Sequence, residues 1–282
     1  YSAHVVFLGK KHPEKHYQSI IGLLEHVMNR ISIITINFNN QSGLKQTIQS
    51  VAQQTYKDFE YLVIDGGSTD GSRELIEENS DLMTYWVSEP DRGIYPAMNK
   101  GIARATGDYC LFLNSGDCLA EATTIEQLCI ELTGEDLIYG NWYKSFPNGK
   151  REPEEFPDQI TFYFLAFHYS LPHQATLIRR DLFDRIGLYN EGLKMVSDWK
   201  FFLDAIFKHH CSYRHIDLFI ALYDKTGFSS NPKNNELQQG ERNQVLETEF
   251  KNLLYVKHEI NGSIFLFRLR NKLKRMTRKF TS

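Results

Sequence analysis

Short apolar runs that end in polar, glycine-rich turns recur along the first half of the chain. Residues 61–64 are aromatic and β-branched, which favours a buried strand, and they lead into the turn Asp65-Gly-Gly-Ser-Thr-Asp70. The two glycines allow a tight turn or the close approach of a ligand, and the polar residues after them suit the start of a helix. The same pattern, an apolar run followed by a polar turn, occurs at residues 31–40 and 109–117.

Helical spacing of apolar residues follows two of these turns, near residues 44–54 and 122–132. Repeated strand, turn and helix units predict an α/β protein whose central sheet is mostly parallel and is flanked by helices. In open sheets of this kind, ligands bind at the carboxyl ends of the strands. We therefore expect the turns at 37–40, 65–70 and 114–117 to form a binding site.

Composition restricts the class of protein. The chain has 282 residues, of which 41% are hydrophobic and 24% charged, as in ordinary soluble proteins. No apolar run approaches the roughly 20 residues of a membrane span, and the basic segment 10–16 interrupts any signal-like start, so we expect neither. The four cysteines lack Cys-x-x-Cys spacing, which favours reduced packing residues in a cytoplasmic protein and gives no support for a zinc site.

The last 22 residues differ from the rest in charge. Residues 261–282 hold seven Lys or Arg and no acid, while the rest of the chain carries 25 basic and 35 acidic side chains. Leu269, Leu273, Met276 and Phe280 form one helical stripe, so a basic amphipathic helix on an anionic membrane surface is predicted. The alternative is a helix whose stripe packs on the protein. Nucleic acid is a poorer partner because the acidic body would repel phosphates.

Three motifs occur in a characteristic order. They are Asp65-Gly-Gly-Ser-Thr-Asp-Gly-Ser72, then Ser88-Glu-Pro-Asp-Arg-Gly-Ile-Tyr-Pro-Ala-Met-Asn-Lys-Gly101, then Leu113-Asn-Ser-Gly-Asp117. Over about residues 30–225 the chain resembles the family 2 glycosyltransferases.

The resemblance implies the GT-A nucleotide-sugar-binding fold. The polar, turn-rich segment 229–235 marks a boundary, so we expect an N-terminal extension at 1–29, a GT-A catalytic domain at 30–228 and a C-terminal helical extension at 229–282. The resemblance also implies an inverting enzyme that moves a sugar from a nucleotide-sugar donor, with a UDP-sugar favoured, to a hydroxyl of a saccharide acceptor. Together with the basic tail it suggests a lipid-linked acceptor in cell-surface polysaccharide biosynthesis, and a peripheral site on the inner face of the cell membrane.

A divalent cation, Mg²⁺ or Mn²⁺, is implied at the third turn, with Asp117 as its ligand. Such a cation neutralises the charge that develops on a leaving diphosphate. Relatives usually carry Asp-x-Asp here, often within Asp-Ser-Asp-Asp, whereas this chain has Asn114 and Gly116 at two acidic positions. Asn114 is either a neutral second ligand or a phosphate donor. Asp117 is alternatively a cap of the following helix.

The resemblance also implies which residues contact the donor. Asp65 would accept the N3 hydrogen of uracil, Phe38 would stack on the base or else belong to the core, and Arg92 would pair with the diphosphate or else lie in a solvated turn. Asp91 suits a sugar or ribose hydroxyl, and Asn99 resembles a position that faces the donor. The full expected set is Ile36, Phe38, Asn39, Asp65, Gly66, Asp91, Arg92, Asn99, Asn114 and Ser115.

Transfer to a hydroxyl requires a base, and the resemblance assigns this role to Asp198, in Ser197-Asp-Trp199. An Asp before an apolar helix is otherwise a favourable N-terminal residue. Trp199 is expected as a sugar platform or as core, and His173 and Gln174 as acceptor-binding residues, although a lone histidine is more often structural.

Two other classes of function are alternatives. A nicotinamide-dependent enzyme would need Gly-x-Gly-x-x-Gly after the first strand, where this chain has Asn37-Phe-Asn-Asn40. The stronger alternative is a non-catalytic nucleotide-sugar-binding or scaffold protein of a membrane-associated glycan assembly complex, since the metal motif is altered.

Overall fold

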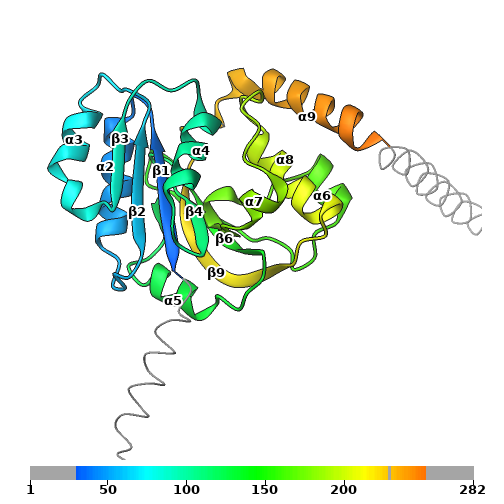
Figure 1. Ribbon diagram of the computed structural model, residues 1–282, viewed down its shortest axis with the longest axis horizontal. Helices are drawn as coiled ribbons and strands as arrows, with labels where there is room; N and C mark the ends of the chain where they lie inside the picture. Colours follow the sequence, from blue (N-terminus) through cyan, green and yellow to red (C-terminus); the bar gives the residue numbers. More distant parts are fainter. Residues whose placement is uncertain (1–29, 228–229, 252–282) are drawn as a thin grey trace, which may run out of the picture.

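The computed structural model describes residues 30–227 and 230–251 as a nine-stranded sheet covered by helices (Figure 1). The strand order is β3-β2-β1-β4-β8-β6-β9-β5, with β7 paired to β6. The four strands of the first half are parallel to one another, as the sequence predicts. They are β1 (Ile31–Asn37), β2 (Glu60–Asp65), β3 (Tyr85–Ser88) and β4 (Tyr109–Phe112).

The second half of the sheet is mixed, which the sequence pattern did not show. β8 (Thr176–Arg179) lies antiparallel between β4 and β6 (Leu137–Ser145), and β9 (Tyr213–Asp224) runs parallel to β6. β5 (Cys118–Leu119) and β7 (Arg151–Glu154) are short antiparallel strands on β9 and β6. This arrangement brings the end of β9 next to the turn that follows β4.

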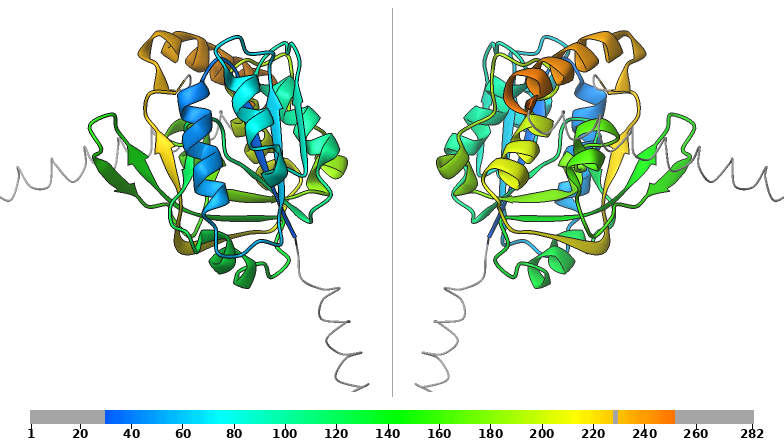
Figure 2. Two further views of the ribbon diagram at one scale, coloured as in Figure 1. Left: turned by 90° about the vertical axis from the view of Figure 1, so that its left-hand side faces the viewer. Right: turned by 90° about the vertical axis from the view of Figure 1, so that its right-hand side faces the viewer.

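Helices cover both faces of the sheet (Figure 2). On β1, Ile31 and Ile33 pack against one set of helices and Ile34 and Ile36 against the other, because successive side chains point to opposite faces. The first set is α2 (Gln41–Ala52), α3 (Ser72–Glu78) and α5 (Thr124–Ile130). The second set is α4 (Ile94–Arg104), α6 (Phe162–Phe167), α7 (Leu182–Ile186), α8 (Ser197–Leu203) and α9 (Asn235–Glu249). The helices expected near 44–54 and 122–132 are α2 and α5. Short 3₁₀ or π segments occur at Ser80–Leu82 (η1), His173–Ala175 (η2), Asp204–Lys208 (η3) and Pro232–Asn234 (η5).

The last described helix, α9, packs on the α8 side of the protein. Val245, Leu246 and Phe250 belong to the same hydrophobic cluster as α4 and α8. Glu241 accepts the backbone N–H groups of Lys194 and Met195. The helix is therefore joined to the sheet domain by both apolar and polar contacts.

The predicted N-terminal extension at 1–29 and the basic tail at 261–282 lie outside the described residues, so both stay predictions. Among the helices that the structure does describe, none is long and apolar enough to cross a membrane.

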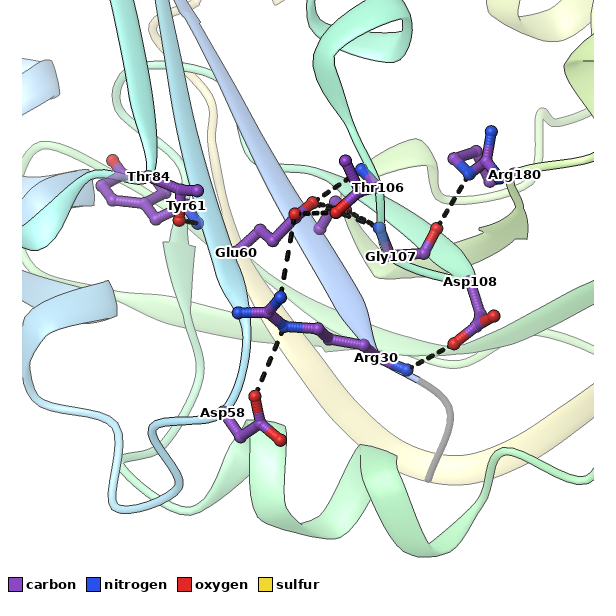
Figure 3. A network of polar contacts seen from close by, with 10 residues as sticks. Arg30, Asp58, Glu60, Tyr61, Thr84, Thr106, Gly107, Asp108 and Arg180 are labelled. Atoms are coloured by element: carbon purple, nitrogen blue, oxygen red, sulfur yellow. Dashed lines mark hydrogen bonds and ion pairs between the residues drawn. The ribbon is translucent and has the colours of Figure 1, made fainter. Parts of the chain in front are cut away.

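A buried carboxylate organises the amino ends of the first strands (Figure 3). Glu60, at the start of β2, is 3% exposed. It accepts hydrogen bonds from Ser32 Oγ at 2.6 Å, Thr106 N–H at 2.8 Å and Gly107 N–H at 3.1 Å, and from the Thr106 hydroxyl. Arg30 approaches it at 3.9 Å. The network holds together β1, β2 and the segment before β4. It lies at the amino ends of these strands, opposite the predicted binding turns.

Candidate active site

The carboxyl ends of β1, β2 and β3 converge on Asp65. This residue is fully buried, and its carboxylate accepts hydrogen bonds from Asn37 Nδ2 at 2.7 Å, Ser68 Oγ at 2.6 Å, Ser68 N–H at 2.9 Å and Ser88 Oγ at 2.6 Å. Burial raises the pKa of Asp65, but these hydrogen bonds outweigh it and hold the pKa below its usual value. The oxygens are engaged by the protein itself. The structure thus favours a role for Asp65 in positioning the turns over the direct contact with a base that we expected.

The turns after β1 and β2 are bonded to each other. Asn39 N–H donates to Ser68 Oγ at 2.7 Å, and Thr69 N–H donates to Asn39 Oδ1 at 2.9 Å. Gln41 N–H donates to Asp70 Oδ2 at 2.8 Å. Asn39 has a left-handed backbone, with φ of 48°, which its side chain tolerates better than most. These bonds give the turns at 37–40 and 65–70 a fixed shape.

Phe38 projects from this fixed region. Its side chain is 66% exposed, so the alternative that it belongs to the core is wrong. It lies against Gly66, where an added Cβ would come within 3.2 Å of the ring, so Gly66 makes room for it. Ile36, in contrast, is 8% exposed and packs in the core, and its carbonyl accepts the N–H of Ser115 at 3.1 Å. Phe38 therefore remains available for stacking, whereas Ile36 contributes backbone.

The third turn, residues 114–117, is hydrogen-bonded to α2 and to β9. Thr47 Oγ1 donates to the Asp117 carbonyl at 2.7 Å and accepts from Gly116 N–H at 3.0 Å. Asp117 is 4% exposed, and its Oδ1 accepts the N–H of Asp224 at 2.9 Å. Burial raises the pKa of Asp117 to about 7, although hydrogen bonds from Asp224 and the Gln174 side chain act in the opposite sense. The structure favours an anchoring role for Asp117 over direct ligation of a cation.

The alternative that Asp117 caps the next helix is wrong, because α5 begins at Thr124 with Thr123 as its N-cap residue. A cation at this turn is instead compatible with Asn114. Its Oδ1 atom is buried and has no hydrogen-bond partner within the described part of the chain. Amide and carboxylate oxygens suit Mg²⁺ or Mn²⁺, which complete their shell with phosphate oxygens and water. Residues 30–227 and 230–251 contain no cluster of three or more His, Cys, Asp and Glu placed to hold a metal by themselves. The turn therefore fits a cation that a diphosphate helps to bind.

In the second motif both acids, Glu89 and Asp91, pair with Lys100, whereas Arg92 forms no ion pair with a described residue. Asp91 forms an ion pair with Lys100 at 2.5 Å, and its Oδ2 atom is buried without a hydrogen-bond partner in the described residues. Arg92 is exposed and pairs with none of the described acids. Asn99 differs from our expectation of a donor contact. It is 7% exposed and bonded to Tyr189 through both its amide nitrogen and its oxygen, so it holds α4 against the 187–191 turn.

Asp198 lies in the first turn of α8, partly exposed. Its Oδ1 accepts the hydroxyl of Tyr95 at 2.8 Å. Burial, together with the negative charge of Asp198, raises the pKa of Tyr95 well above its usual value, so the phenol stays a hydrogen-bond donor. Tyr95, from α4, is a site residue that sequence reasoning missed because an aromatic residue at helical spacing indicates core.

The segment η2 lies between the third turn and Asp198. The Gln174 side chain bonds to Asp117, and the charge of Asp198 acts on the neighbouring His173. His173 is 5% exposed, contacts Tyr189 Oη at 2.9 Å and stacks on Phe112 with ring centroids 4.8 Å apart. Burial lowers the pKa of His173, which favours the neutral ring. His173 thus packs within the protein and supports its neighbours. That His173 and Gln174 contact the acceptor stays a prediction.

Trp199 is core, so the prediction of a sugar platform is wrong. It is 1% exposed and donates from Nε1 to the carbonyl of Leu165 at 2.7 Å. Arg242 of α9 lies over its ring, 4.8 Å from the centroid. Burial lowers the pKa of Arg242, and the negative charge of Asp198 opposes this effect. Sequence reasoning missed Arg242, because it lies in a polar helix without a motif.

A separate hollow of about 160 Å³ opens where β4 begins and β8 ends. Its volume is below the roughly 300 Å³ at which ligand pockets begin, so it does not suit a nucleotide sugar. It is lined by Asp108, Tyr109, Gly134, Arg179, Arg180 and Asp181.

Several solved structures share this architecture. S. aureus TarS in complex with UDP matches with a TM-score of 0.58 and 21% identity, over 69% of this chain and 60% of that one. The mannosyltransferase PcManGT from Pyrobaculum calidifontis, in complex with GDP-Man and Mn²⁺, matches with a TM-score of 0.51 and 16% identity, over 73% of this chain and 62% of that one. The chain thus spans about 60% of the length of these two solved structures. The fold is the GT-A fold of glycosyltransferases.

Sequence comparison gives the family. The family described as glycosyl transferase family 2 matches residues 32–187, and the chain belongs to this family. An uncharacterized glycosyltransferase of Mycobacterium tuberculosis is 34% identical over 207 residues, 71% of this chain and 77% of the relative. A PGL/p-HBAD biosynthesis glycosyltransferase of Mycobacterium bovis is 32% identical over 206 residues, 71% of this chain and 78% of the relative. The resemblance on which the fold and class were predicted is confirmed.

Proposed function

We propose that the protein is an inverting glycosyltransferase that moves a sugar from a UDP-sugar to a hydroxyl of a saccharide acceptor. One observation carries the proposal. Asp198 is a partly exposed carboxylate at the start of a helix, and Tyr95 fixes one of its oxygens at 2.8 Å. The other oxygen has no hydrogen bond to a described residue. A carboxylate that is oriented through one oxygen and open at the other suits a general base.

In the proposed reaction, Asp198 accepts the proton of the acceptor hydroxyl while the hydroxyl oxygen attacks the anomeric carbon. The bond from that carbon to the diphosphate breaks in the same step, so the configuration inverts and no covalent intermediate forms. Tyr95 keeps the carboxylate in place during the transfer. A bound Mg²⁺ or Mn²⁺ would neutralise charge on the diphosphate, and Asn114 in the third turn would help to hold it.

The donor side rests on Phe38 and Arg92. The exposed Phe38 ring beside Gly66 offers an apolar face for the base, and Arg92 offers phosphate oxygens a guanidinium that none of the described acids pairs with. The structural relative TarS is in complex with UDP, which supports a uridine donor. The M. bovis relative acts in PGL/p-HBAD biosynthesis, which supports a cell-surface glycan, and we propose a lipid-linked acceptor.

The direct test is transfer by wild type and Asp198→Asn. Full-length protein is given a panel of UDP-sugars and lipid-linked saccharides, with UDP binding measured in parallel by calorimetry. Loss of a general base lowers the rate by about 10²- to 10⁴-fold, so Asp198→Asn should lose transfer and retain UDP binding. Asp184→Asn is the matched control, since Asp184 is an exposed acid in the first turn of α7. If wild type binds UDP-sugars without transfer, the non-catalytic alternative replaces this proposal.

We also propose that the protein is cytoplasmic and peripheral on the inner face of the cell membrane, through residues 261–282. Each basic residue near an anionic surface contributes about 1 kcal/mol, so the seven Lys and Arg residues are expected to dominate vesicle binding. Replacing all seven with Gln in the full chain should abolish sedimentation with vesicles that contain phosphatidylglycerol and leave UDP binding intact. Unchanged sedimentation would remove the membrane proposal.

A further inference from the structure

Asp224, the last residue of β9, lies beside Gly116 in the third turn. The antiparallel pairing of β5 with β9, in which Cys118 faces Leu222, brings the two segments together. A Cβ atom added to Gly116 would lie 2.8 Å from Asp224 Oδ2 and 3.5 Å from the carboxylate carbon. The carboxylate of Asp224 therefore occupies the space into which a side chain at position 116 would project.

The carboxylate of Asp224 is held in this place by its own turn. Thr226 N–H and Thr226 Oγ1 donate to Asp224 Oδ1, both at 2.8 Å, and Oγ1 also lies 2.7 Å from Oδ2. The backbone N–H of Asp224 is bonded to Asp117 Oδ1 at 2.9 Å. No Lys, Arg or His of residues 30–227 and 230–251 forms an ion pair with it. Asp224 thus places an oriented negative charge, without a basic partner in this part of the chain, at the turn.

A second observation at the same turn indicates a ligand. Asn114 Oδ1 is buried and lacks any hydrogen-bond donor among the residues described. A buried oxygen without a donor is unfavourable unless a ligand supplies the missing contact. An amide oxygen and a carboxylate oxygen are both ligand types that hard divalent cations take.

We propose that Asp224 supplies the carboxylate that positions 114 and 116 lack, and that it binds Mg²⁺ or Mn²⁺ together with Asn114 Oδ1. The inference rests on the proposed function, because the diphosphate of the donor completes the shell. Mg²⁺ sites in proteins commonly use one or two carboxylates with phosphate oxygens and water, so one carboxylate from β9 suffices. The altered motif is then not a degenerate site. Its acid comes from a distant part of the sequence.

The test is Mn²⁺ binding to full-length protein, measured by loss of the free Mn²⁺ electron paramagnetic resonance signal with and without UDP. Asp224→Asn should weaken Mn²⁺ binding by about tenfold or more while binding of UDP without metal stays unchanged. Asp217→Asn is the control, because Asp217 is an exposed acid on the same strand. Asp224→Glu, which keeps the charge, should bind Mn²⁺ more tightly than Asp224→Asn.

The outcomes separate this inference from the proposed function. If Asp224→Asn binds Mn²⁺ as tightly as wild type, or if wild type binds no Mn²⁺, the inference is wrong. If wild type binds Mn²⁺ but no uridine nucleotide, the proposed donor is wrong while the loss in Asp224→Asn still supports the cation site. If Asp224→Asn does not fold, Asp224→Ser removes the same charge, and retained Mn²⁺ binding in that variant overturns the inference.

Discussion

Replacing Glu60 with glutamine should destabilise the fold without touching the site. In the wild type one oxygen of Glu60 accepts three hydrogen bonds, from Ser32, Thr106 and Gly107, and the residue is 3% exposed. Glutamine can keep three acceptor contacts but loses the negative charge. A hydrogen bond to a charged group contributes about 1 kcal/mol more than a neutral one, so the three weakened bonds cost about 2 to 3 kcal/mol of unfolding free energy. Glu60→Ala leaves these donors without an acceptor and should cost more.

The same reasoning gives the pH dependence. Burial raises the pKa of Glu60, but the hydrogen bonds from Ser32, Thr106 and Gly107 outweigh it and hold the pKa below its usual value. A lowered pKa in the folded state means that the stabilisation is complete above the unfolded pKa and is lost as the pH falls through the folded pKa. Urea unfolding followed by tryptophan fluorescence should therefore show that the difference in unfolding free energy between wild type and Glu60→Gln is constant near pH 7 and becomes smaller below about pH 4.5. Equal unfolding free energies at pH 7, or a difference between the two proteins that stays the same in acid, would refute the reasoning.

Three further substitutions distinguish residues that act in the site from residues that stabilise the fold. Tyr95→Phe removes the 2.8 Å hydrogen bond to Asp198 and should lower kcat about tenfold with little change in donor KM, and an unchanged kcat would contradict the positioning role. Phe38→Ala should weaken UDP binding about 5-fold, from lost stacking of about 1 kcal/mol, as measured by calorimetry, and equal affinity would exclude a stacking contact. Trp199→Phe removes the bond to Leu165 and should lower the unfolding free energy by about 1 to 3 kcal/mol in urea titrations while acceptor KM stays constant; a rise in acceptor KM alone would restore the sugar platform.

The sequence predicts the first half of the sheet well. Residues 31–36, 61–64 and 109–113 are apolar on both faces, as parallel strands between two helix layers must be, and they form β1, β2 and β4. The second half is harder to predict. β8 inserts between β4 and β6, although residues 146–175 separate it from β6 along the chain, and no local pattern specifies such a pairing.

The sequence predicts which kinds of residue lie at the strand ends better than it predicts the contacts that they make. The motifs correctly mark the three strand-end turns, but Asp65, Asn99 and Trp199 are buried and bonded within the protein. A sequence pattern cannot distinguish a polar residue that faces a ligand from one that supports it, because both favour the same residue types. Asp224 was missed for another reason. Its proximity to Gly116 results from the pairing of β5 with β9, which only the folded chain shows.

The hydrogen bonds between the turns at 37–40 and 65–70 have a consequence for how the protein can diversify. Because Asn39, Ser68 and Asp70 order these turns during folding, donor binding carries little entropic cost for arranging them. The same bonds mean that most changes within the turns alter the stability of the whole domain. Exposed residues such as Phe38 and Arg92 have no such constraint, so under the proposed function a change of donor can arise there while the domain remains folded.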